Sequence, residues 1–283
     1  MINPSSNRLQ PDFLCIGAPK AGTTWLHGNL ALHPQVWFTP VKEIHYFDRY
    51  YFKDTQSFVE KAQLRRLSRG IQRKIKGEPI DSNYLSFLSN MYLNDQKDDD
   101  WYLSLFKDAK PDSVIGDMTP LYCALPEVGV KHIRDLLGDI KIIFIMRNPV
   151  KRAWSNVLMT KRSDVKKGIE IADEQWLKML KVKSRKVRGN YISTIDNYEK
   201  YFSNIQYLFY DQVRLDPMGF LKQVCEFLGI EYKSDYFENN VSQIYNKNPK
   251  VPIPRAVEDF LIKEYQEQTE WIKAKFNPYS FEL

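Results

Sequence analysis

The sequence is poor in the residues that build disulfide frameworks and metal cages. It has 283 residues but only three cysteines and four histidines. The cysteine count is odd, and two of the three stand in apolar runs, which is typical of buried free thiols. The sequence also lacks any run of 18 apolar residues, and its first residues lack the basic and then apolar pattern of a signal peptide. We therefore expect a cytoplasmic chain with no membrane-inserted segment and no metal site.

An apolar run that breaks into a glycine-bounded loop is the most informative feature present. Residues 13–17 read as a buried strand, and residues 18–22 (Ala-Pro-Lys-Ala-Gly) read as a loop before a helix. The first N–H groups of a helix lack partners and carry partial positive charge, so they bind phosphate. Lys20 and the hydroxyls of Thr23 and Thr24 add further donors to this predicted phosphate loop.

The loop departs from the nucleotide-triphosphate (Walker) pattern, in which Lys and then Ser or Thr directly follow the second glycine. Here Thr23 follows Gly22, and the only lysine in the loop is Lys20. A second apolar run, residues 141–146, ends in Arg147, where a Walker strand would end in a metal-binding Asp. An arginine fork suits a phosphate and cannot ligate Mg²⁺, so the two segments predict a metal-free site for a different phosphate ester.

These motifs resemble the sulfotransferases that use 3′-phosphoadenosine 5′-phosphosulfate (PAPS). The family's 5′-phosphosulfate loop is similar to residues 19–25, and its 3′-phosphate motif is similar to residues 147–149 followed by Ser155. The Glu-x-His-x-Phe-Asp spacing of residues 43–48 is closest to glycan sulfotransferases of the heparan sulfate type and to bacterial relatives. The resemblance implies an α/β fold related to P-loop NTPases, with one sulfotransferase domain over residues 1–283 and a central parallel sheet flanked by helices.

The resemblance also implies a role for each residue of the donor site. Lys20 would bridge the leaving oxygen and the sulfonate, while Arg147 and Ser155 would hold the 3′-phosphate. Residues 243–283 would supply a lid over the nucleotide and a C-terminal helix. The other cofactor-binding residues of this prediction are Ala21, Gly22, Thr23, Thr24, Trp25, Tyr191, Lys247 and Lys250. The alternatives are a solvated loop lysine at position 20, a structural ion pair at Arg147 and an ordinary helical serine at position 155.

Glu43 resembles the family's catalytic glutamate, which takes a proton from the acceptor, and His45 is the second candidate for this base. In an extended segment both side chains point to one side, so both could face the acceptor. A carboxylate base works near neutral pH if partial burial raises its pKa, whereas a histidine needs no such shift. The alternatives are that Glu43 only pairs with Lys42 or another cation and that His45 is a packing residue. Met118 stands where the glycan enzymes commonly carry a lysine, so a glycan, a lipid and a natural-product alcohol all stay open as acceptors, as does an amine.

Strand patterns alternate with helical patterns along the chain, which indicates a parallel sheet with helices on both faces. We then expect three features to meet at the carboxyl edge of that sheet: Glu43, Arg147 and the loop that follows the first strand. Residues 77–100, rich in Asn and Asp, read as an irregular excursion. The predicted strands are 13–17, 35–39, 113–116, 141–146 and 205–210. The predicted helices are 22–33, 55–76, 100–108, 125–137, 149–162, 171–182, 192–203, 217–228 and 255–274.

Positive charge gathers in residues 141–191, which hold 14 Lys and Arg against 4 Asp and Glu. Such a region attracts a doubly phosphorylated nucleotide and an anionic acceptor, or it is a solvated helical face. No zinc-finger spacing or RNP-like aromatic motif supports a nucleic-acid partner. Two other functions stay open: a Mg²⁺-dependent small-molecule kinase, with Asp117 as the candidate metal ligand, and a non-catalytic nucleotide-binding protein.

Overall fold

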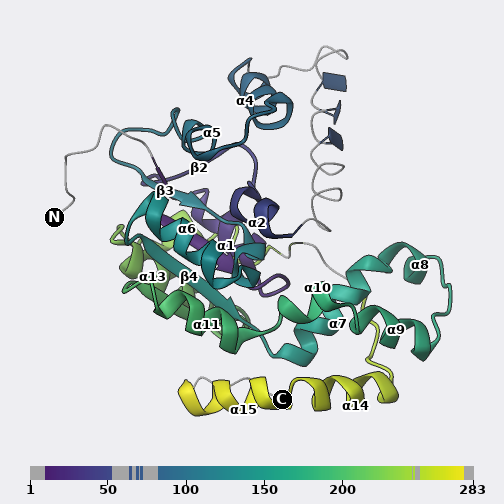
Figure 1. Ribbon diagram of the computed structural model, residues 1–283. Coiled ribbons are helices and arrows are strands. Elements are labelled where there is room, and N and C mark those ends of the chain that lie inside the picture. Colours follow the sequence, from purple (N-terminus) through teal and green to yellow (C-terminus); the bar gives the residue numbers. More distant parts are fainter. Residues whose placement is uncertain are drawn as a thin grey trace.

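Five parallel strands in the order β2-β3-β1-β4-β5 form the centre of the molecule (Figure 1). β1 pairs with β3 on one side and with β4 on the other, so that Leu14 lies between Asp117 and Ile142. The computed structural model describes residues 10–52, 64–65, 68–69, 71–72, 82–243, 245 and 249–276. The strands are β1 (Phe13–Gly17), β2 (Val36–Phe38), β3 (Val114–Asp117), β4 (Lys141–Met146) and β5 (Ile205–Phe209).

The helices surround this sheet. The α-helices are α1 (Thr23–Leu30), α2 (Tyr46–Tyr51), α4 (Ser82–Leu93), α5 (Asp99–Ser104), α6 (Glu127–Leu137), α7 (Pro149–Thr160), α8 (Arg162–Lys166), α9 (Asp173–Leu180), α10 (Lys183–Val187), α11 (Tyr191–Glu199), α12 (Tyr210–Leu215), α13 (Pro217–Leu228), α14 (Arg255–Glu264) and α15 (Gln266–Lys275). There are also two short 3₁₀ helices, η1 (Pro120–Ala124) and η2 (Ser234–Tyr236).

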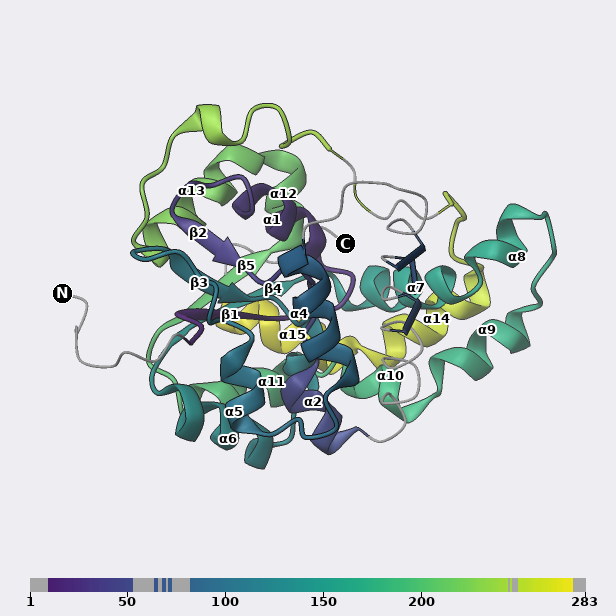
Figure 2. The same cartoon turned by 90° about the horizontal axis from the view of Figure 1, so that it is seen from above.

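The sheet is a buried layer between helices, as its apolar sequence requires. Every residue of β1 is buried, and so are five of the six residues of β4. Seen from above, the sheet runs between α1 and α13 on one side and α6 and α11 on the other (Figure 2). Strands covered on both faces read as continuous apolar runs, because neither face meets water. The predicted parallel α/β fold is therefore confirmed, with each predicted strand within one residue of its observed ends.

A side lobe projects from the carboxyl end of β4 in both views (Figures 1 and 2). It is built from α7 to α10 and from α14, and it has its own apolar cluster, separate from the core around the sheet. Trp154 of α7 packs edge-on against Trp176 of α9, with ring centroids 4.8 Å apart, and Val257 and Leu261 of α14 complete this cluster. The C-terminal part of the chain thereby stabilises the helix that follows Arg147.

Two local predictions are wrong. Residues 82–93 form the helix α4 rather than an irregular excursion, because Phe87, Leu88 and Met91 lie at helical spacing and are buried on one face. The helix predicted over 255–274 is two helices, since Tyr265 has non-helical backbone angles and its hydroxyl reaches the buried Arg152. The helix predicted over 55–76 falls largely outside the described residues. Within the described ranges, no helix combines the length and apolar character needed to cross a bilayer.

Candidate active site

The phosphate loop joins β1 to α1 at the carboxyl edge of the sheet. Gly22 has φ +90°, a left-handed conformation that suits glycine, and α1 begins at the next residue. A Cβ atom at Gly22 would lie 2.9 Å from Cδ2 of Tyr210, so the missing side chain is also required for space. Thr23 and Ala21 are buried and Thr24 is half-buried. The predicted arrangement of strand, loop and helix N-terminus is present.

Arg147 follows β4 and lies against this loop. Its Nη1 donates a hydrogen bond to the carbonyl oxygen of Lys20 (3.0 Å), and its guanidinium lies 4.6 Å from the ring centroid of Tyr210. The Tyr191 hydroxyl donates to the Arg147 carbonyl oxygen (2.9 Å), which fixes the main chain at this point. The carboxyl ends of β1 and β4 therefore bring Lys20 and Arg147 together, as the sheet topology predicts.

Lys20 and Arg147 bring two positive charges near each other at the loop. Burial lowers the pKa of Lys20, and the positive charges of Arg147 and Arg162 lower it further. Burial likewise lowers the pKa of Arg147. Among the described residues, neither side chain has a carboxylate at salt-bridge distance, and the Lys20 ammonium reaches only Met159 Sδ (3.5 Å). A bound polyanion would relieve this repulsion, so the residues present fit a nucleotide with separate phosphate groups.

A second charged cluster lies beside the loop, in the segment between β2 and α2. Lys42 Nζ donates to Glu43 Oε1 (3.1 Å) and to Thr24 Oγ1 (3.4 Å), which joins this cluster to the first turn of α1. The other Glu43 oxygen lies 3.3 Å from His45 Nε2, and Asp48 Oδ2 lies 2.8 Å from His45 Nδ1. Glu43 is the most exposed member, with 35% of its side chain accessible, against 1% for Asp48.

The electrostatics of this cluster differ from the sequence-based prediction. Burial opposes ionisation of Glu43, but the positive charge of Lys42 and the bond from His45 hold its pKa well below the usual range. The upward pKa shift that would suit Glu43 as a base near neutral pH is therefore not found. Burial also disfavours a charged His45, but Asp48 and Glu43 together raise the pKa of His45 to about 10. At neutral pH the cluster thus contains an ionised glutamate and a protonated histidine.

The backbone around these residues is not extended, which is a further correction. Glu43 has φ +66° and His45 has φ +58°, both left-handed. The two side chains converge through this double bend rather than through the alternation of a strand. Both alternatives considered from the sequence are also present, because Glu43 pairs with Lys42 and both ring nitrogens of His45 have partners.

The remaining predicted donor-site residues differ in burial and in their hydrogen-bond partners. Trp25 is buried, and its Nε1 donates to the Val241 carbonyl oxygen (2.9 Å). Tyr191 is fully buried against Arg147. Ser155 is half-buried on α7, and Lys250 is exposed just before Val251, whose carbonyl oxygen accepts from Trp154 Nε1. Lys247 lies outside the described residues. Contacts of these residues with a nucleotide stay predictions.

Two residues of the site escaped the sequence analysis. Tyr210 lies between Gly22 and Arg147, and it could have been found because it directly follows β5, whose carboxyl end is at the same edge. Lys42 was considered only as a partner of Glu43, although it also reaches α1. Among the described residues, no group of three or more His, Cys, Asp or Glu side chains is placed to hold a metal ion.

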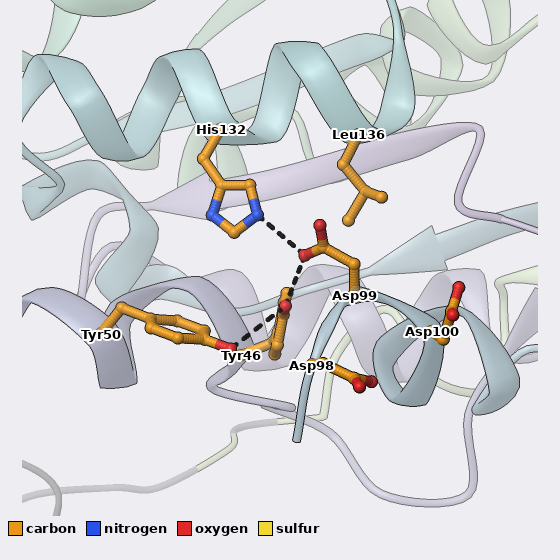
Figure 3. Close-up of a pocket in the computed structure, with 7 residues that line it drawn as sticks. All are labelled: Tyr46, Tyr50, Asp98, Asp99, Asp100, His132 and Leu136. Carbon is orange, nitrogen blue, oxygen red and sulfur yellow. Dashed lines mark hydrogen bonds and ion pairs between the residues drawn. The ribbon is translucent and has the colours of Figure 1, made fainter. Parts of the chain in front are cut away.

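A surface pocket of about 510 Å³ lies between α2, α5 and α6 (Figure 3). Tyr46, the residue after His45, is one of the residues that line it. Asp99 accepts a hydrogen bond from the Tyr46 hydroxyl (2.5 Å), and the same oxygen lies 2.8 Å from His132 Nε2. These groups satisfy one another and anchor the first turn of α2. The pocket is lined by Tyr46, Tyr50, Asp98, Asp99, Asp100, His132 and Leu136.

Comparison with known proteins finds sulfotransferases by family model and by sequence similarity. A family model described as "Sulfotransferase family" matches residues 11–234. Heparan sulfate glucosamine 3-O-sulfotransferase 6 of Mus musculus is 27% identical over 226 residues, which cover 78% of this chain and 53% of that protein. Carbohydrate sulfotransferase 15 of Mus musculus is 27% identical over 170 residues, 53% of this chain and 27% of that protein. The chain thus spans about half the length, or less, of these two relatives.

Solved structures show the same fold. A sulfotransferase from Alicyclobacillus acidocaldarius superposes with a TM-score of 0.62 at 19% identity and covers 97% of both chains. The sulfotransferase domain from the curacin biosynthetic pathway superposes with a TM-score of 0.59 at 15% identity, covering 98% of this chain and all of that one. At these identities the likeness concerns the fold, and the chemistry must be argued from the residues.

Proposed function

Because this chain belongs to the sulfotransferase family, we propose that it transfers the sulfuryl group of PAPS to an acceptor hydroxyl or amine without a metal ion. One observation carries the proposal. Lys42 connects Glu43 (3.1 Å) to Thr24 at the start of α1 (3.4 Å), so a candidate base lies beside a candidate phosphate site. Transfer between a bound anionic donor and an acceptor needs both groups at one place.

The cationic residues suit the donor. PAPS supplies a sulfuryl group bonded to its 5′-phosphate, and that sulfur–oxygen bond breaks as a bond to the acceptor forms. Lys20 would stabilise the charge that develops on the leaving oxygen, while the N-terminus of α1 would bind the 5′-phosphate. Arg147 and Ser155 would hold the 3′-phosphate. The pairing of Lys20 with Arg147 at the loop supports these roles.

Glu43 is the better candidate for the base. It is ionised at neutral pH and is the most exposed member of its cluster, so it can accept a proton, although the charge of Lys42 and the bond from His45 make it a weaker base than an ordinary glutamate. His45 is protonated in the free protein because Asp48 and Glu43 raise its pKa to about 10, and a protonated imidazole cannot accept a proton. Glu43 would take the acceptor proton during attack, with Lys42 and His45 balancing its charge.

For the acceptor we propose an alcohol of a glycan, with a lipid or natural-product alcohol as the alternative. The mouse relative is named for 3-O-sulfation of heparan sulfate glucosamine, which supports a glycan. Met118 supports the alternative, because it is 2% exposed and cannot supply the charge of the lysine that glycan enzymes commonly carry there. Transfer from ³⁵S-labelled PAPS to heparan sulfate, to a neutral glycan and to a lipid alcohol would separate these classes.

The donor site is tested by calorimetry with 3′-phosphoadenosine 5′-phosphate (PAP), with and without Mg²⁺, and with ATP for comparison. We expect PAP to bind more tightly than ATP and independently of Mg²⁺. Arg147→Ala should weaken PAP binding about tenfold to a hundredfold, because it removes charged hydrogen bonds to a phosphate. Lys222→Ala, at an exposed lysine of α13, is the control for loss of one positive charge. Mg²⁺-dependent preference for ATP, with Arg147→Ala without effect, would instead indicate the kinase.

A further inference from the structure

The segment that carries Glu43 and His45 has an unfavourable backbone. Both residues adopt left-handed angles, at φ +66° and φ +58°, which residues with a Cβ atom seldom do. The segment also lies before α2 and outside the sheet, so no strand pairing supports it. Contacts from elsewhere in the fold must therefore hold this bend.

Two backbone amides, one on each side of His45, are held by hydroxyl groups from η1 and from the residue that precedes it. The Ile44 N–H donates to Thr119 Oγ1 (3.0 Å), and the Tyr46 N–H donates to the Tyr122 hydroxyl (3.1 Å). All four residues are buried. The residue that pairs with Glu43 is thus fixed from both sides by partners far along the chain.

A single carboxylate orients both hydroxyls. The Thr119 hydroxyl donates to Asp117 Oδ1 (2.8 Å), and the Tyr122 hydroxyl donates to Asp117 Oδ2 (3.1 Å). The Tyr102 hydroxyl donates to the same Oδ2 (3.0 Å). Burial raises the pKa of Asp117 to about 6, so above that pH the carboxylate is ionised and only accepts hydrogen bonds. Because a hydroxyl has one proton to give, each hydroxyl keeps its lone pairs for the backbone N–H. Asp117 is 2% exposed, and both its oxygens are engaged by hydroxyls, unlike those of a metal ligand.

We infer that Asp117 is a positioning residue for the proposed sulfuryl transfer, acting through Thr119 and Tyr122 to hold the bend that presents Glu43. The inference rests on the proposed function only where it predicts that Asp117 affects the rate of sulfuryl transfer. The structural effect, placement of His45 against Glu43, is independent of the reaction. Charged groups around His45 are Glu43, Asp48 and, from β3, Asp117.

The inference is tested with Thr119→Val, which keeps the branched shape and removes the hydroxyl, and with Thr119→Ser, which keeps the hydroxyl. Thr194→Val is the matched control, since Thr194 is another buried threonine, 3% exposed, whose hydroxyl bonds a carbonyl oxygen (2.7 Å). In the full chain, the ¹⁵N chemical shifts of the His45 ring are followed from pH 6 to 10.5. We expect His45 to lose its proton at a lower pH in Thr119→Val than in wild type, Thr119→Ser or Thr194→Val.

Turnover is measured in parallel with ³⁵S-labelled PAPS and heparan sulfate. Thr119→Val should lower kcat at least tenfold and leave the dissociation constant of PAP within twofold of wild type, whereas Thr119→Ser should recover most of kcat. A wild type inactive on heparan sulfate would count against that acceptor, and the His45 titration would still decide the inference. If Thr119→Val is unfolded by circular dichroism, Tyr122→Phe takes its place. An unchanged His45 titration, or equal effects of Val and Ser at position 119, would overturn the inference.

Discussion

His45 shows what two carboxylates do to one imidazole. Burial alone would lower its pKa, but Asp48 and Glu43 raise it from the ordinary 6.5 to about 10. The folded protein therefore retains a proton that the unfolded chain releases as pH rises above about 6.5. The resulting stabilisation is complete below pH 6.5 and is lost as pH rises toward 10.

This shift predicts a pH-dependent difference between wild type and His45→Gln. The free energy of unfolding of wild type should exceed that of the variant most at pH 6.5, and the excess should shrink by pH 9.5. Urea denaturation of both proteins at several pH values measures it, because all other titrating groups are common to both. An excess that stays constant over this range would show that His45 is not held protonated by its neighbours.

At the scale of elements, the start of α1 depends on its contact with the residue after β5. A Cβ atom at Gly22 would lie 2.9 Å from the Tyr210 ring, on which the Arg147 guanidinium lies. Gly22→Ala should therefore strain the loop, displace Tyr210 and weaken PAP binding roughly tenfold, as measured by calorimetry.

Gly138→Ala supplies the control for this substitution. Gly138 also has a left-handed φ, at +76°, but a Cβ atom there would meet nothing within 4 Å. It should lower stability through backbone strain and leave PAP binding unchanged. Equal PAP affinity in Gly22→Ala and wild type would show that the fit between Gly22 and Tyr210 has no part in the donor site.

Across the whole molecule, charge is distributed unevenly. The segment 141–191 holds 14 Lys and Arg against 4 Asp and Glu, and much of it forms the side lobe next to Arg147. Such a field should accelerate the approach of an anionic nucleotide, and salt should screen it. Lys166→Glu with Lys167→Glu, both exposed at the end of α8, should slow PAP association a few-fold at 20 mM NaCl and little at 300 mM.

Stopped-flow tryptophan fluorescence measures these rates. The dissociation rate should hardly change, because neither lysine belongs to the proposed donor site. Lys222→Glu with Lys233→Glu is the matched control, since it changes the net charge equally from exposed positions outside the lobe. If both double variants slow association equally, net charge rather than its placement controls the approach.

Features that depend on a short stretch of sequence could be predicted, whereas features that depend on contacts between distant segments could not. Strands and the phosphate loop are local patterns, so residues 13–22 and 141–147 were sufficient to place Lys20 and Arg147 at one edge. The family follows from the same residues and from 43–48. The ionisation of Glu43 and the left-handed bend depend on contacts such as the one from Ile44 to Thr119, which join distant segments. Single-segment patterns carry no information on those contacts.

For the helix α4, by contrast, the local sequence pattern was sufficient but was misread. Its asparagines suggested a loop, whereas burial of Phe87, Leu88 and Met91 decides its conformation. Composition favours turns at exposed positions, but packing of an apolar face determines whether a helix forms. A helical prediction for 82–93 was available from the spacing of those three residues alone.

The contact of Tyr210 with Gly22 and Arg147 has a consequence for the synthesis of the protein. The Tyr210 ring that contacts the loop lies about 190 residues further along the chain, so it is made roughly 10–40 s after the loop at ordinary elongation rates. During that interval the strands β1 to β4 are made without β5, the neighbour of β4. The contact of Tyr210 with Gly22 and Arg147 is therefore completed only after β5 has been made, however early the loop itself is synthesised.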